Sequence, residues 1–235
     1  MIVRRKALIL ALLLLASCRA QNDSPATNNS NSDTVVSTTP PFTTKEPERY
    51  RATRTITNVT ADGKTNVIKH SIAKDGELRR FEAEFASKKM IFLDLPEGKL
   101  LLLPGEKVYA GQSGGPLPGS SDEDESSPER LLHTETGNSS YQKLGTESIS
   151  GRTTEKYRVV VNGANAANVS SSETLIWIDE ALGMPVRSET KSSDGSRSTM
   201  ELSDIALDVD KNLFQVPNDF KKISFSELIG YLAKP

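Results

Sequence analysis

The chain has 235 residues, a formal net charge of −2 and 36% hydrophobic residues. A nearly balanced charge excludes the strongly basic profile of nucleic-acid-binding proteins, so we expect no nucleic-acid partner. The length allows one domain of moderate size with a tether, or two small domains, and the modest apolar content indicates that a polar segment dilutes an otherwise normal core.

The first 17 residues have the pattern of a secretory signal peptide. Three cations at positions 4–6 precede an apolar run over 7–15, about half the ~20 residues that a membrane-spanning helix needs. The run ends in Leu15-Ala16-Ser17-Cys18, which resembles the lipobox of bacterial lipoproteins. The resemblance implies cleavage before Cys18, a diacylglyceryl group on its sulfur and an acylated amine. An ordinary signal peptide with a chance cysteine is the alternative.

The resemblance to lipoproteins sets the expected location. Cys18 is the only cysteine of the chain, and lipidation would account for a thiol that has no disulfide partner. We expect acylated Cys18 to bind the membrane. Because Arg19 does not resemble an inner-membrane retention signal, we expect the outer membrane, with the protein facing the periplasm. Residues 18–47 are rich in Ser, Thr, Asn and Pro, so we expect a disordered tether before a domain over 48–235.

Hairpin turns separate strand-like runs throughout the expected domain. Turn sequences at 61–64, 74–77, 96–99, 103–106 and 193–196 each carry a glycine that we expect at a positive φ. The expected strands cover 49–59, 78–85, 89–95, 99–103, 142–149, 154–162, 173–179, 185–192 and 197–209. This spacing predicts a sheet-rich sandwich or barrel, and the lack of alternating helical patterns disfavours a doubly wound α/β fold.

Two short helices are predicted beside the strands. Ser127 and Pro128 can begin one that carries Leu131 and Leu132, directly after an acidic Gly/Pro-rich insert over 112–127. The second covers 224–233, where Ser224 and Glu227 match a capping box. The carboxylates at 122–125 in the insert are either a solvated charge run or a site for a hard cation such as calcium.

The usual motifs of enzymes are weak in this chain. Ser113 lies in a G-x-S-x-G pattern, but prolines follow where a hydrolase needs a helix. Ser71 and Lys74 have Ser-x-x-Lys spacing, yet residues three apart in a strand point to opposite faces. His70 and His133 are the only histidines. We therefore expect no catalytic residue, no metal site and no cofactor.

The order of elements over residues 48–222 resembles the LolA/LolB-like lipoprotein-carrier family. The residues that carry this resemblance are the stretches 103–109, 151–159, 175–179, 182–187 and 213–217, together with Leu131-Leu132. The resemblance implies a mainly β fold, namely a strongly curved antiparallel sheet or unclosed β-barrel covered by one or two short helices. The chain departs from the family in lacking a clear long helix before Tyr50.

Two functions follow as expectations. The first is a non-enzymatic, lipid-anchored binding module that holds a lipophilic ligand, or the acyl chains of a lipoprotein, between the curved sheet and its helical cover. Its candidate ligand-binding and gate residues are Leu131, Leu132, Phe81, Phe85, Phe92 and Trp177. The alternative is a non-catalytic envelope interaction or structural lipoprotein, in which the same aromatic residues fill a packed core.

Overall fold

The computed structural model describes residues 36–85, 87–111, 139–161 and 172–233. The chain divides into two compact units, Met1–Asp33 and Thr34–Pro235. The first unit lies outside the described residues, as do Cys18, the acidic insert and the expected helix with Leu131 and Leu132. In the described ranges of the second unit, no helix combines the length and apolar character needed to cross a bilayer.

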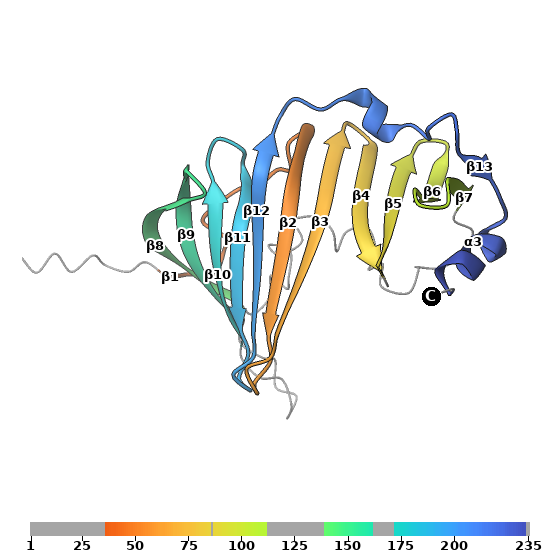
Figure 1. Ribbon diagram of the computed structural model, residues 1–235. Coiled ribbons are helices and arrows are strands. Elements are labelled where there is room, and N and C mark those ends of the chain that lie inside the picture. Colours follow the sequence, from red (N-terminus) through yellow and green to blue (C-terminus); the bar gives the residue numbers. More distant parts are fainter. Residues whose placement is uncertain (1–35, 86, 112–138, 162–171, 234–235) are drawn as a thin grey trace, which may run out of the picture. The chain divides into compact units, whose positions relative to one another are not determined.

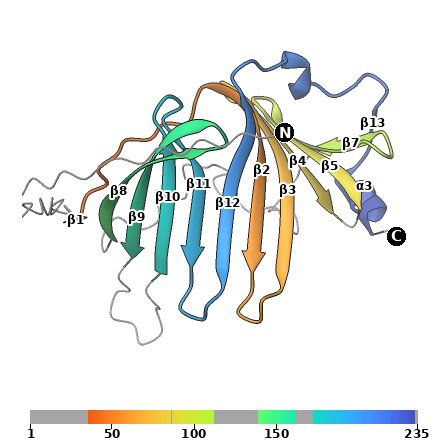
Figure 2. The same cartoon turned by 60° about the vertical axis from the view of Figure 1, so that its left-hand side comes forward.

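The described residues form one open sheet of thirteen strands (Figure 1). Its order is β1-β8-β9-β10-β11-β12-β2-β3-β4-β5-β6-β7-β13, and only the β7–β13 pair is parallel. The strands are β1 (Val36–Ser37), β2 (Arg49–Val59), β3 (Thr65–Asp75), β4 (Leu78–Phe85), β5 (Lys88–Leu95), β6 (Gly98–Leu103), β7 (Val108–Gly111), β8 (Ser139–Ile149), β9 (Arg152–Val161), β10 (Ser172–Asp179), β11 (Met184–Lys191), β12 (Arg197–Ala206) and β13 (Lys221–Lys222). The expected curved and unclosed antiparallel sheet is confirmed (Figure 2).

Most of the expected turns match the structure, with one correction. Gly76, in the turn between β3 and β4, has a φ of 64°, which a side chain would strain. Gly105 was expected at a positive φ but does not have one; Lys107 has the positive φ in that turn, at 52°. The turn still begins at Leu103, whose carbonyl accepts the Glu106 N–H, and its left-handed residue stands just before β7 begins.

Strand register divides the sheet into two faces. Residues directly opposite one another across a ladder project from the same face. One face, called here the Phe81 face, carries Phe81 with its cross-strand partners Ile72 and Phe92. The other, called the Thr55 face, carries Thr55 with its partners Lys69 and Glu201.

A short helix covers the Phe81 face over β5 to β7. Helix α3 (Phe225–Leu232) begins at Ser224, whose side chain accepts the N–H of Glu227 in the predicted capping box. Leu228 is fully buried against Met90, Leu101 and Ala110. The predicted C-terminal helix is therefore confirmed, and its apolar side packs on the sheet.

The connection between β12 and β13 covers the opposite face of the same strands. It contains the 3₁₀ helix η1 (Lys211–Phe214), and Phe214 packs with Ala73. Further along, Val216 and Phe220 pack against Leu93 and other residues of β5 and β6. Strands β5 and β6 are thus covered on both faces, which explains why their sequences are apolar without strict alternation.

Residues 36–47 differ from the expected tether. Strand β1 pairs with β8, and the Phe42 ring lies edge-on to Tyr157, with 4.8 Å between ring centroids. The Lys45 N–H donates to the Gly183 carbonyl at 2.8 Å. A polar composition predicts disorder on average. Here the Phe42 ring and the buried Glu46 carboxylate hold the segment against the sheet.

Candidate functional site

An apolar row crosses the Phe81 face through six strands. Its members lie opposite one another in the ladders from β2 to β7: Ala52, Ile72, Phe81, Phe92, Leu101 and Ala110. With strands about 4.8 Å apart, the row spans about 24 Å. Helix α3 packs on its β5–β7 part, so the row continues from beneath the helix to Ile72 and Ala52.

A cation and an imidazole border the row at Phe81. The Arg54 guanidinium carbon lies 5.5 Å from the centre of the Phe81 ring, and the His70 ring centre lies 4.6 Å from it. Arg54 Nη2 and His70 Nδ1 are 3.2 Å apart. Burial, and then the charge of Arg54, lowers the pKa of His70 to about 4. The imidazole is therefore neutral at pH 7 and accepts a hydrogen bond from Arg54 at Nδ1.

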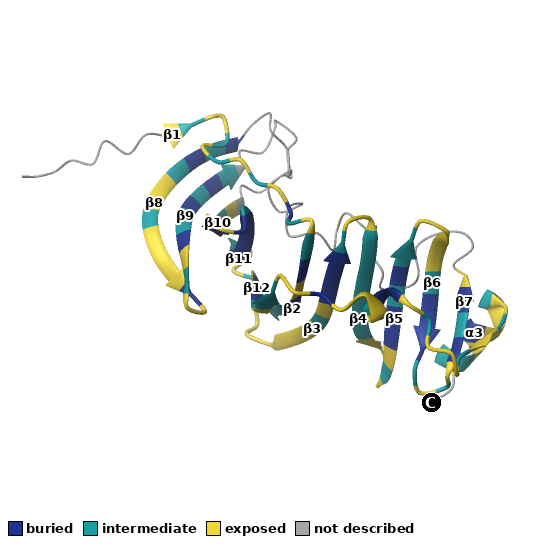
Figure 3. Cartoon of the chain, turned by 90° about the horizontal axis from the view of Figure 1, so that it is seen from above, coloured by how far each residue is buried: buried dark blue, intermediate teal, exposed yellow. Residues whose placement is uncertain are grey.

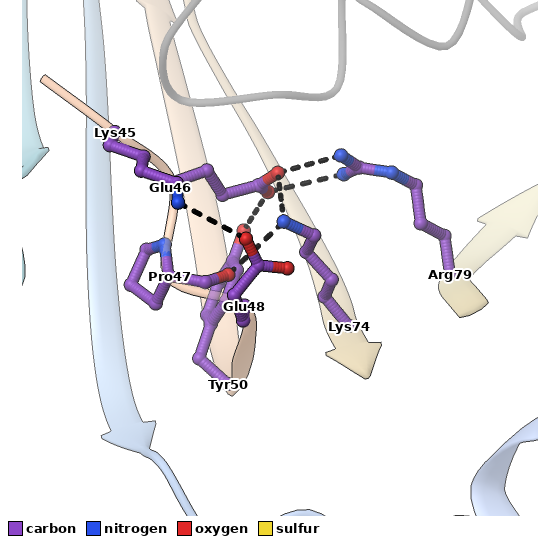
Figure 4. Close-up of polar contacts among 7 residues, drawn as sticks. All are labelled: Lys45, Glu46, Pro47, Glu48, Tyr50, Lys74 and Arg79. Atoms are coloured by element: carbon purple, nitrogen blue, oxygen red, sulfur yellow. Dashed lines mark hydrogen bonds and ion pairs between the residues drawn. The ribbon is translucent and has the colours of Figure 1, made fainter. Parts of the chain in front are cut away.

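Glu46 is the centre of a buried polar cluster on the same face (Figure 4). Its side chain is 5% exposed, and its two oxygens accept hydrogen bonds from Arg79 at 3.1 and 2.7 Å. The Tyr50 hydroxyl donates to it at 2.7 Å, and Lys74 Nζ lies 3.3 Å away. Burial alone would raise the pKa of Glu46, but hydrogen bonds from Arg79 and Tyr50 and the charges of Arg79 and Lys74 hold it below its usual value.

The Glu46 carboxylate also links strands β3 and β4. Lys74 on β3 and Arg79 on β4 are directly opposite in the β3–β4 ladder. Two adjacent cations repel each other, and Glu46 pairs with both. On the Thr55 face, Arg80 Nη1 donates to the Leu213 carbonyl at 2.6 Å. The β3–β4 junction is therefore held from both faces by segments distant in the sequence.

The β3–β4 ladder is much shorter than the strands that form it. It contains five pairs, from Ser71–Glu82 to Asp75–Leu78, and 65–70 of β3 and 83–85 of β4 do not pair with each other. Figure 1 shows the two strands diverging beyond this point. Ile68 and Phe85, which project from the Phe81 face on either side, are 37% and 48% exposed. We call this divergence the β3–β4 split.

The predicted site residues fall into three groups. Phe81 and Phe92 lie together in the apolar row, with 5.8 Å between ring centres, and Phe85 lies at the split. Leu131 and Leu132 are outside the described residues, as are Ser113, His133 and the carboxylates at 122–125. Within the described residues, no group of three His, Cys, Asp or Glu side chains could hold a metal ion.

Strand register does not place Trp177 on the Phe81 face, where it was expected with the other candidate ligand-binding residues. It lies opposite Arg187 and Lys156 in the ladders, and this register places it on the Thr55 face. The Lys156 ammonium and the Arg187 guanidinium lie 4.6 and 5.1 Å from its ring, and its Nε1–H donates to Glu147 at 2.9 Å. The side chain is 3% exposed. Trp177 is therefore a packed core residue, and it belongs to the same buried cluster as Ala52 and Ile72 of the apolar row.

A polar hollow lies over β2, β3 and β12 on the Thr55 face. Its volume is about 230 Å³. It is lined by Thr55, Thr57, Lys69, Thr199, Glu201 and Ser203. The Glu201 carboxylate accepts a hydrogen bond from Arg187 at 3.3 Å. Hydroxyl groups and paired charges make this a hydrated surface, in contrast to the apolar row behind it.

The role of Glu46 was not predicted from the sequence, because the segment before β2 has the composition of a disordered tether. Its partners Lys74 and Arg79 are about 30 residues away in the chain, so no local motif joins them. The available signal was the aromatic residue Phe42 and the carboxylate of Glu46 within a stretch otherwise rich in Ser, Thr and Pro. Such isolated residues in a polar segment are candidates for contact with the domain.

No protein-family model and no curated protein matches the chain. Among solved structures, the chain is similar to lipoprotein LppX of Mycobacterium tuberculosis, with 10% identity, a TM-score of 0.39, and coverage of 68% of this chain and 88% of that one. It is also similar to a LolA superfamily protein of Nitrosomonas europaea, with 15% identity, a TM-score of 0.32, and coverage of 73% and 92%.

Proposed function

We propose that the chain is a non-enzymatic, lipid-anchored binding module of the cell envelope that takes a lipophilic ligand on the Phe81 face. The observation that carries this proposal is the apolar row, which continues from the strands beneath α3 across Phe92 and Phe81 to Ile72. A row of about 24 Å exceeds the ~15 Å thickness of one leaflet's hydrocarbon, so it has the length for an acyl chain.

The bordering polar groups support an amphiphilic ligand in place of a purely apolar one. Arg54 and neutral His70 lie against Phe81, within reach of a group bound on the row. Pockets for small molecules are mostly apolar and use a few polar groups to fix orientation. The acyl chain of a lipid or of a lipoprotein, with its polar end near Arg54, is the ligand class that combines both features.

Attachment through acylated Cys18 and residence at the outer membrane belong to the same proposal. The supporting features are the three cations, the short apolar run and the Leu15-Ala16-Ser17-Cys18 ending. The described part of the chain begins at β1, which pairs with β8 at one edge of the sheet. A membrane anchor at Cys18 would hold the domain close to the lipids.

A packed structural module is the second candidate function. Tyr50, Met184 and Leu202 are almost fully buried in one cluster on the same sheet, as a filled interior requires. In this alternative, the apolar row stabilises the fold and the protein acts through its surface. Binding of a lipid distinguishes the two functions, because a filled interior has no room for an acyl chain.

The test is mass spectrometry of organic extracts from the full-length purified protein. We expect a lipid in a fixed ratio to wild type, and its loss from Phe81→Ser. Phe220→Ser is the matched control, since Phe220 is also half-buried but packs on the opposite face. Circular dichroism confirms that both variants fold. Extracts of folded wild type without lipid, together with no binding of a fluorescent fatty acid, would establish the packed module instead.

A further inference from the structure

The β3–β4 split is a fixed feature of the sheet. Strand β3 pairs with β2 along its whole length, from Arg49–Asp75 to Val59–Thr65. Strand β4 pairs with β5 down to Phe85–Lys88. Each strand is therefore held by its outer neighbour while the two diverge from each other, so the split is not the fraying of a free edge.

Exposed apolar side chains gather at this opening. The described residues include six exposed large hydrophobic side chains, and two of them, Ile68 and Phe85, project from the Phe81 face at the split, while Val67 projects from the Thr55 face of β3. Figure 3 shows β3 changing along its length from exposed to buried. Single exposed hydrophobic residues are normal, but a group of them beside an apolar row marks a binding or entrance site.

Two lines of side chains lead from the opening to the apolar row. On β3, Ile68 and His70 precede Ile72, and on β4, Phe85 and Ala83 precede Phe81; all project from the Phe81 face. The lines converge where Ile72 lies opposite Phe81. The opening is thus continuous with the row and narrows toward it.

We propose that the β3–β4 split is the entrance through which an acyl chain reaches the Phe81 face, and that Glu46 sets how far it opens. The inference rests on the proposed function. The occupant is a single acyl chain, because two converging lines of side chains, apolar except for neutral His70, lead to the row. A peptide would instead pair with the free backbone of 65–70 and 83–85, and it is a competing outcome of the test.

Glu46 acts at the closed end of the ladder. Its carboxylate pairs with Lys74 on one strand and Arg79 on the other, three pairs before Ser71–Glu82, where the ladder ends. Replacing it with a neutral amide leaves the two cations facing each other without a counter-charge. The ladder should then open further, so a chain should enter and leave faster.

Stopped-flow uptake of a fluorescent fatty acid by the full chain tests this entrance. For the double variant Ile68→Ser with Phe85→Ser we expect association and dissociation both about tenfold slower, since the chain must cross a polar rim, with little change in equilibrium affinity. Leu144→Ser with Leu207→Ser is the matched control, because both side chains are exposed and lie away from the split. Glu46→Gln should accelerate both steps.

The outcomes separate the entrance from the function. Uptake by wild type with unchanged rates in the rim variant overturns the entrance and leaves the proposed function standing. If Ile68→Ser with Phe85→Ser lowers the affinity but leaves the association rate unchanged, these two side chains are part of the binding site itself. That result also overturns the proposal of an entrance at the split. Binding of an extended peptide that the fatty acid does not displace identifies a peptide site instead. No uptake by wild type overturns both proposals.

Discussion

At the residue scale, Glu46 joins three side chains of the sheet in one buried polar cluster. A carboxylate that is 5% exposed and bonded to Arg79, Lys74 and Tyr50 contributes stability only while all partners remain. Removing one member of a buried charge cluster leaves the others uncompensated, which costs more than the cluster itself contributes. The same residue fixes the segment before β2 to the sheet and joins β3 to β4.

Glu46→Gln should therefore lower the free energy of unfolding by about 3 kcal/mol. The measurement is urea denaturation followed by circular dichroism at pH 7. Glu48→Gln is the matched control, because Glu48 is 69% exposed and pairs only with exposed Lys45 among the ion pairs described. Its effect should stay within about 0.5 kcal/mol. Equal effects of the two substitutions would contradict a stabilising role for the buried Glu46 cluster with Arg79, Lys74 and Tyr50.

The lowered pKa of Glu46 also makes the stabilising contribution of this buried cluster depend on pH. Its stabilising contribution is present above the usual carboxyl pKa of 4.5 and is lost as pH falls through the lower value in the folded state. Wild type should therefore lose its advantage over Glu46→Gln only below about pH 4.5. An advantage already lost at pH 6 would show that another group is responsible.

His70 gives a second titration with a different pH range. Its pKa is about 4 in the folded state against 6.5 in the unfolded chain, so the unfolded state binds a proton first as pH falls. Stability from this residue is complete above pH 6.5 and decreases between pH 6.5 and 4. NMR of the imidazole protons, assigned with His70→Gln, should give a midpoint near 4. A midpoint at 6 or above would place His70 in water, away from Arg54 and Phe81.

At the element scale, strands with clear turns and alternation were predictable. The expected ranges 49–59 and 78–85 coincide with β2 and β4. Strand β3 was not predicted, because its first five residues are exposed and its polar side chains hide the alternation. Strands β1 and β13, of two residues each, carry no pattern of their own. Their positions depend on contacts with distant segments, which local sequence does not encode.

Helix α3 shows the opposite case, in which local sequence was sufficient. Ser224→Ala should cost about 1 kcal/mol, because it removes the side chain that accepts the Glu227 N–H. Ser226→Ala is the control, since Ser226 is exposed in the same helix. Thermal unfolding should show a lower midpoint for the first variant alone. A larger effect of Ser226→Ala would mean that helix propensity, and not the cap, governs α3.

At the scale of the whole molecule, the sheet consists of two parts joined by a short ladder. One part contains β1, β8 to β12, β2 and β3, and the other contains β4 to β7 and β13. Five residue pairs join them, with Glu46 on one face and the η1 connection on the other. Alternation along the strands predicted which residues share a face. The length of this ladder was not predictable, because it depends on contacts that Glu46 and the η1 connection make from distant parts of the chain.

The anchor is the remaining feature at this scale, and it gives the last prediction. Cys18→Ala should move the protein from the membrane to the soluble fraction, because each buried CH₂ of an acyl chain contributes ~0.8 kcal/mol and several chains are expected on one residue. Fractionation of cells, with wild type and the exposed-site variant Glu48→Gln as controls, provides the measurement. Metabolic labelling with a palmitate analogue should mark wild type and not Cys18→Ala. If Cys18→Ala still pellets with membranes as wild type does, attachment comes from another part of the chain, and the ligand face would have to be oriented by contacts of the folded domain itself.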